Sequence, residues 1–79
     1  MKFNKWLDTL VEEKGVDLED GFQVEKNGEL HFFDYGYVVE AIKIAPVNEQ
    51  KGIQNMLVKI DFYNGDICDY FRHLAQALC

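Results

Sequence analysis

The chain of 79 residues contains no serine, one proline and two cysteines. Because serine is absent, serine nucleophile chemistry is excluded. The two cysteines, Cys68 and Cys79, are too few and too late in the chain for the multi-disulfide framework of a small secreted domain. We therefore expect a cytoplasmic protein.

Long hydrophobic runs are also missing. No stretch approaches the roughly 18 apolar residues of a membrane-spanning helix, and the N-terminal residues lack the apolar core of a signal peptide. We therefore expect no contact with a membrane. The length predicts one small compact domain over residues 1–79.

Positive charge is scarce, with 8 basic against 14 acidic residues and a net charge of -6. Residues 1–40 carry ten acidic side chains and four lysines, which gives -6, whereas residues 41–79 carry four of each sign. Phosphate backbones attract positive charge, so this balance argues against direct binding to nucleic acid. The acidic first half is either a solvated surface that keeps the protein soluble or a face for a basic partner.

No catalytic, cofactor or metal motif rises above background. The histidine and cysteine side chains that could bind a soft metal ion are His31, Cys68, His73 and Cys79. They do not form the close ligand pairs of zinc modules. A pocket large enough for a ligand would remove much of the core of so small a domain. We expect a non-enzymatic protein without a cofactor, and the alternative is a small-molecule-binding domain or minimal enzyme with a pocket between a hairpin and helices.

Apolar residues recur at helical spacing in three segments. The first, ended by Gly15, contains Phe3, Trp6, Leu7, Leu10 and Val11. The second follows Asp34 as N-cap, stops at Pro46, and contains Tyr35, Val38, Val39 and Ile42. The last follows Asp66 as N-cap and contains Ile67, Tyr70, Phe71, Leu74 and Leu78.

The segment after Pro46 has two interpretations. A helical stripe runs through Ile53, Met56, Leu57 and Ile60. Residues 57–62 also alternate between apolar and charged side chains, which is typical of a strand. The helical stripe is longer, so we predict a helix and keep a third strand at 57–62 as the alternative. The fold class is then α+β: an N-terminal helix, a β-hairpin and three helices.

Residues 22–32 form two alternating runs around Asn27-Gly28, a strong hairpin signal. A two-residue loop would pair Val24 with His31 and mix polar and apolar residues on both faces. A three-residue loop over 26–28 would pair Val24 with Leu30 and make one face wholly apolar. We predict the second register, which places the following residues on the outer face: Gln23, Glu25, Glu29, His31 and Phe33.

Residues 31–37 hold four aromatic side chains and a histidine. Strand and helix phase place Phe32 and Tyr35 inside, which leaves Phe33 and Tyr37 as candidates for exposure, although the N-terminal helix is an alternative cover for Phe33. Aromatic rings surrounded by polar groups are typical of contact surfaces. The candidate protein-binding residues are therefore Glu25, Glu29, His31, Phe33, Asp34 and Tyr37.

Four segments, at 13–18, 35–42, 55–62 and 64–66, carry a resemblance to known proteins. They read EKGVDL, YGYVVEAI, NMLVKIDF and NGD. In these segments the chain resembles a family of short uncharacterised bacterial proteins that includes phage and mobile-element examples. The resemblance implies a cytoplasmic accessory protein and supplies no reaction or ligand.

Together these patterns predict a small acidic protein-protein interaction module, acting as an adaptor, an inhibitor or a homodimer. An unidentified partner would be basic or itself a nucleic-acid-binding protein, whose phosphate ligand the acidic face would imitate. Such binding weakens as salt screens the charges.

Overall fold

The computed structural model describes residues 2–62 and 65–78. Its elements follow in the order α1 (Phe3–Glu13), β1 (Gly21–Lys26), β2 (Glu29–Asp34), α2 (Tyr35–Lys43), α3 (Val47–Phe62) and α4 (Ile67–Leu78). The predicted α+β order, a helix, a hairpin and three helices, is confirmed. Cys79, and Asn64 of the segment that resembles the bacterial family, lie outside the described residues.

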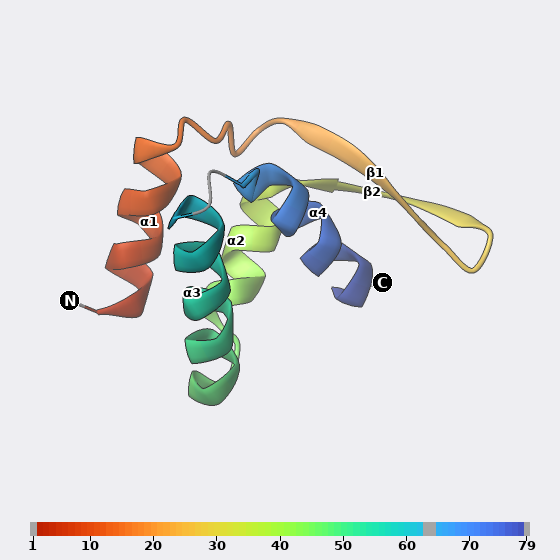
Figure 1. Cartoon of the computed structure of the whole chain (residues 1–79). Coiled ribbons are helices and arrows are strands. Elements are labelled where there is room, and N and C mark those ends of the chain that lie inside the picture. Colours follow the sequence, from red (N-terminus) through yellow and green to blue (C-terminus); the bar gives the residue numbers. More distant parts are fainter. Residues whose placement is uncertain (1, 63–64, 79) are drawn as a thin grey trace.

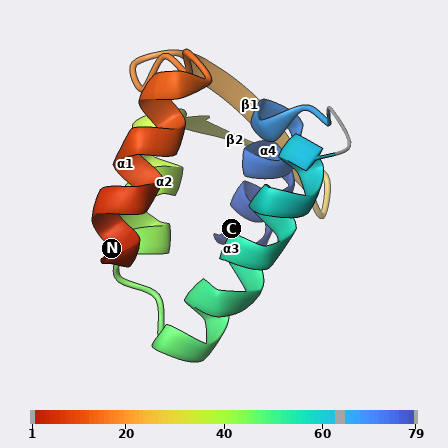
Figure 2. The same ribbon diagram turned by 60° about the vertical axis from the view of Figure 1, so that its left-hand side comes forward.

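The helices pack beside one another and the hairpin projects from them (Figures 1 and 2). Helix α2 packs against both α1 and α4, and α4 also contacts α3 and β1. The buried side chains of all these elements form one cluster. Its members are Leu7, Leu10, Val11, Phe22, Val24, Tyr35, Val38, Val39, Ile42, Leu57, Ile67, Phe71 and Ala75.

Helix ends follow the local sequence. After α1, the N–H of Gly15 donates to the carbonyl of Glu12 and that of Val16 to Val11. This is a Schellman motif, and Gly15 occupies its left-handed position with φ 67°. The side chains of Asp34 and Asp66 accept N–H groups in the first turns of α2 and α4, which confirms both predicted caps.

Residues 57–62 belong to α3, so the helix prediction is confirmed and the alternative third strand is wrong. Leu57 is fully buried, whereas its neighbour Val58 is exposed. Helical phase explains this difference, because only one stripe of α3 faces the core.

The predicted register of the hairpin is wrong. Phe22 pairs with Phe33, Val24 with His31 and Lys26 with Glu29, so the loop is Asn27-Gly28 alone. Both loop residues have positive φ, 55° and 80°. A type I′ turn needs positive φ at both central positions, and its twist matches that of the strands. This turn chemistry outweighs the advantage of one wholly apolar face.

Candidate functional site

The register gives the hairpin two faces of different character. The inner face, directed at the helices, carries Phe22 and Val24 opposite Phe33 and His31. The outer face carries Gln23 and Glu25 opposite Phe32 and Leu30. We use these two names below for these two sets of residues.

The outer face exposes two large apolar side chains. Leu30 is 67% exposed and Phe32 is 72% exposed, and they are neighbours on β2 because they lie two residues apart. The ring of Phe32 lies over Gly21 of β1, where a side-chain methyl group would collide with it. The absence of a side chain at Gly21 thus leaves room for this ring against the backbone of β1. Phe32, predicted to be inside, is therefore an exposed aromatic group on a sheet surface.

The inner face continues as a row of rings toward α2. The rings of His31 and Phe33 have centroids 6.5 Å apart, and those of Phe33 and Tyr37 are 5.3 Å apart. Glu29 begins the row, with its Oε2 atom 3.8 Å from Nε2 of His31. Tyr37 is 55% exposed. Phe33 is half-buried because the rings of Phe22 and Tyr37 pack against it.

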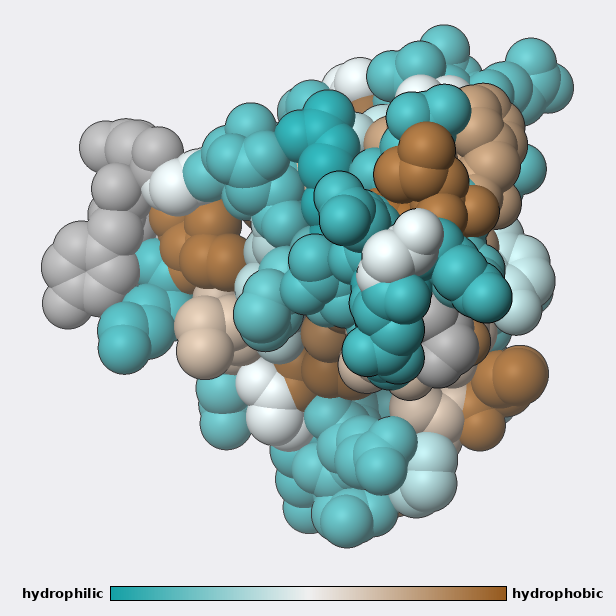
Figure 3. Space-filling view, turned by 90° about the vertical axis from the view of Figure 1, so that its right-hand side faces the viewer, coloured by the Kyte–Doolittle hydropathy of each residue, from teal (hydrophilic) through white to brown (hydrophobic). Residues whose placement is uncertain are grey.

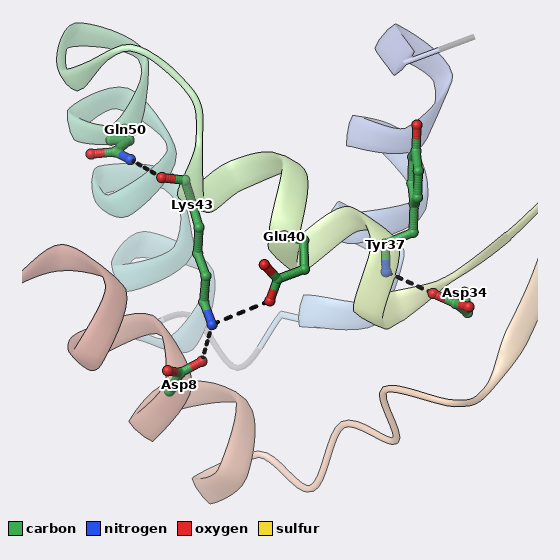
Figure 4. A network of polar contacts seen from close by, with 6 residues as sticks. All are labelled: Asp8, Asp34, Tyr37, Glu40, Lys43 and Gln50. Carbon is green, nitrogen blue, oxygen red and sulfur yellow. Dashed lines mark hydrogen bonds and ion pairs between the residues drawn. The ribbon is translucent and has the colours of Figure 1, made fainter.

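The six predicted site residues therefore occupy three places. Glu29, His31, Phe33 and Tyr37 form the row, while Glu25 lies on the opposite face. The carboxylate of Asp34 accepts the N–H of Tyr37 at 2.6 Å and thereby caps the N-terminus of α2 (Figure 4). Sequence reasoning missed Leu30 and Phe32, and the signal that identifies them is the preference of Asn-Gly for a two-residue loop.

Charges near the hairpin are mostly negative at the surface. The ammonium of Lys26, on β1, donates to the carbonyl of Gln76 on α4 at 3.0 Å. Glu25, Glu29 and Asp34 are exposed.

Seen from the side toward which the hairpin projects, hydrophobic side chains emerge as separate patches among hydrophilic ones (Figure 3).

A second polar network joins α1 to α2. The ammonium of Lys43 lies 2.6 Å from Oδ1 of Asp8 and 3.5 Å from Oε1 of Glu40 (Figure 4). The hydrogen bond with Asp8 raises the pKa of Lys43. This lysine is therefore engaged away from the hairpin.

The space between hairpin and helices, where the alternative interpretation places a ligand, is a polar groove of about 380 Å³ between β1 and α4. Arg72 and His73 line it together with Glu25 and Asp69. The guanidinium of Arg72 donates a hydrogen bond to Oδ1 of Asp69 at 2.7 Å. Because the cation and the carboxylates offset each other, the groove has no strong preference for an anion.

Buried groups behind this groove are structural. Arg72 lies 5.8 Å from the centre of the Tyr35 ring, which is packed in the core. Burial raises the pKa of Tyr35, so its hydroxyl is neutral at neutral pH.

Within residues 2–62 and 65–78, no three histidine, cysteine, aspartate or glutamate side chains are grouped so that they would hold a metal ion. In the same residues, no helix has the length and apolar character needed to cross a membrane. Comparisons with protein-family models, curated proteins and solved structures found no match to this chain. The resemblance to short bacterial and phage proteins stays a prediction.

Proposed function

We propose that this protein is a small non-enzymatic interaction module whose hairpin binds a partner protein with basic side chains. The observation that carries the proposal is the exposure of Leu30 and Phe32 side by side on the outer face, next to the carboxylate of Glu25. A few side chains buried at the centre of a contact carry most of the binding free energy of a typical interface, and aromatic residues are enriched there.

The surrounding charge supports a basic partner. Glu25 lies opposite Leu30 on the outer face, and Glu29 and Asp34 are the first and last residues of β2. The one lysine of the hairpin, Lys26, donates to a carbonyl of α4. Carboxylates at the rim of an interface attract positive charge and set the association rate, and salt weakens this effect. We infer that the apolar pair supplies affinity and the acids select the partner.

A foreign partner is favoured over a second copy joined through β2. If two β2 strands paired antiparallel over their full length, Glu29 would lie opposite Asp34 of the other copy at both ends. Like charges directly opposite each other on paired strands are destabilising. A strand or loop with lysine or arginine at these positions would meet both carboxylates favourably.

Three tagged proteins test the proposal in nuclease-treated host lysate: the wild type, the variant Leu30→Ser/Phe32→Ser, and the control Met56→Ser/Val58→Ser. The control removes two apolar side chains from α3 that are also exposed. We expect the wild type and the control to capture the same partner at low salt. The hairpin variant is expected to bind this partner at least about tenfold more weakly. Circular dichroism must show that all three fold.

The captured partner is then titrated with the triple variant Glu25→Gln, Glu29→Gln and Asp34→Asn in calorimetry. Weaker binding and a smaller salt dependence are the expected results. The proposal is wrong if the folded hairpin variant binds the partner as the wild type does. It is also wrong if light scattering shows a dimer that Leu30→Ser/Phe32→Ser converts to monomer, because the outer face would then be a self-association surface.

A further inference from the structure

An apolar groove lies between α2, α3 and α4, on a part of the molecule separate from the hairpin outer face. Its volume is about 270 Å³. Among the described residues that line it, all but Glu49 are apolar: Val38, Ala41, Ile42, Ala45, Ile53, Leu74, Ala77 and Leu78. We call this the three-helix groove.

A second hollow of about 310 Å³ lies along α2, and Ala41 lines both. Tyr37 and Ile44 line this second hollow, and Ile44 is 85% exposed. The apolar surface therefore continues across α2. A scattered exposed residue is ordinary, whereas apolar groups gathered along a hollow are typical of an interaction site.

Small side chains give the groove its shape. Ala41 and Ala45 line it from α2 and the segment after it, and Ala77 lines it from α4. Alanine lets a neighbouring backbone approach closely, and packed helices are about 8–10 Å apart. A guest helix lying along these positions would extend the existing packing of helices with aliphatic side chains between α2 and α4.

The charge of the groove selects the guest. Glu49 lines the three-helix groove and Glu40 the second hollow, and no lysine, arginine or histidine is among the described residues lining either one. Glu49 has no ion pair within the described part of the chain, whereas Glu40 lies near Lys43. Lys43 is itself held by Asp8 on α1.

Helix dipoles add to this charge. The C-terminal ends of α2 and α4 both border the groove, through Ile42 and Leu78. Each helix C-terminus carries about half a negative charge, and the N-terminus of α3 carries about half a positive one. With the full charge of Glu49, the sum is clearly negative, so a cationic guest is favoured.

We propose that the three-helix groove binds an amphipathic helix of a partner protein, with aliphatic side chains in the groove and a lysine or arginine at Glu49. The proposal does not depend on the hairpin. It assigns the molecule a second contact surface that takes a helix, a mode in which affinity comes from apolar anchors spaced three or four residues apart.

The probe is a fluorescent peptide of about 18 residues, roughly five helical turns, with a stripe of leucines flanked by lysines. Its counterpart has glutamate at every lysine. Fluorescence anisotropy at low salt measures both against wild type and against Ala77→Arg, which places a bulky cation at an exposed groove position. We expect the lysine peptide to bind wild type at least about tenfold more tightly than Ala77→Arg, and the glutamate peptide to bind weakly to both.

Glu49→Lys and Glu12→Lys form a matched pair, because both reverse one exposed acid and change the net charge equally. Glu12 lies on α1, which does not line the groove. We expect Glu49→Lys to weaken the lysine peptide about three- to tenfold and Glu12→Lys to change it less than twofold. Thermal unfolding of each variant confirms that it folds.

Equal weakening by Glu49→Lys and Glu12→Lys would overturn the proposal, because binding would then follow net charge alone. Undiminished binding to folded Ala77→Arg would overturn it as well. Loss of the peptide in Leu30→Ser/Phe32→Ser with full binding to Ala77→Arg would place the helix on the hairpin. That outcome would contradict the groove and leave the proposed hairpin function standing, so the two proposals fail separately.

Discussion

Both faces of the hairpin carry large apolar side chains, and these side chains differ in burial. Phe22 and Val24 on the inner face are buried against the helices, whereas Leu30 and Phe32 on the outer face are mostly exposed. The strands have the same length and are paired residue by residue. Because both pairs are apolar, the difference in burial comes from the side of the sheet on which each pair lies, which the register of the hairpin sets.

This contrast distinguishes the side chains that stabilise the fold from those that the fold leaves exposed. The inner face supplies core contacts, including Phe22 with Tyr35 at 4.8 Å between ring centroids. The outer face contributes little burial, and a polar pair in place of Leu30 and Phe32 would satisfy the same strand pattern. The exposure of these two large apolar side chains on one face is the basis of the proposed contact with another molecule.

The strongest test of the contrast is truncation on each face. Phe22→Ala removes a buried ring and is expected to lower the free energy of unfolding by about 3–5 kcal/mol, whereas Phe32→Ala is expected to lower it by less than about 1 kcal/mol. Urea unfolding measures both. Because Phe22→Ala removes much of the stability of so small a domain, Phe22→Leu, expected to cost less than about 1.5 kcal/mol, is the milder substitute.

Similar losses for Phe22→Ala and Phe32→Ala would contradict the contrast. Sedimentation at several protein concentrations then distinguishes an outer face covered by self-association from a hairpin with a different register in solution.

The turn that sets the register gives the next largest effect. Gly28 has φ 80° and Asn27 has φ 55°, so Gly28→Ala places a Cβ in the left-handed region and is expected to cost about 1–2 kcal/mol. Asn27→Gly keeps the required conformation and is expected to change stability by less than about 1 kcal/mol. Thermal unfolding checks both, and a Gly28→Ala protein as stable as the wild type would show that the faces do not depend on this turn.

The base of the hairpin offers a test that separates stability from charge. Asp34→Ala removes the N-cap of α2 and is expected to cost about 1 kcal/mol. Asp34→Asn keeps a capping oxygen and removes the charge, so its stability is expected to stay close to the wild type while partner binding weakens. The two variants are compared by chemical unfolding and by binding, and equal loss of stability in both would mean that the charge itself supports the cap.

The smallest expected effect lies outside the hairpin and serves as a reference for it. Pairing with Asp8 raises the pKa of Lys43, so the folded protein keeps this proton to higher pH than the unfolded chain does. The pair, worth at most about 1 kcal/mol, therefore stabilises fully below the unfolded pKa of about 10.4 and is lost as the pH rises through the folded value.

Lys43→Met removes this contribution, so the difference in melting temperature from the wild type is expected to shrink above about pH 10.4. Tyr35, whose pKa burial also raises, titrates in both proteins and cancels in the difference. A difference that is constant across this range would contradict the role of Asp8. Partner binding at neutral pH is expected to be the same in both proteins.

The sequence predicts the helices and their caps because these are local properties. Helical phase places Leu57 inside and Val58 outside, and Asp34 and Asp66 act on N–H groups two or three residues away. Such patterns require no knowledge of what the element packs against.

The hairpin faces were predicted wrongly because two local rules disagreed. Uniform hydrophobicity of one face favoured pairing Val24 with Leu30, whereas Asn27-Gly28 favoured pairing Val24 with His31, and the structure follows the turn. As a result, Phe32, which the sequence places inside, is exposed, and Phe33, which the sequence leaves as a candidate for exposure, is half-buried. The three-helix groove is beyond prediction from the chain alone, since Ala41, Glu49 and Ala77 come together only through packing.

The side-chain amide of Gln50, in the first turns of α3, donates to the carbonyl of Lys43 at the end of α2 (Figure 4). It also donates to the carbonyl of Ile42. The last carbonyls of a helix lack an intrahelical N–H partner, and that of Ile42 also accepts the N–H of Ala45. The corner around Pro46 is thereby cross-linked without a covalent bond, and we expect α2 and the first turns of α3 to open together in amide hydrogen exchange. We expect these two consecutive helices to form one cooperative opening unit that depends on the side chain of Gln50, and Gln50→Ala to uncouple their protection.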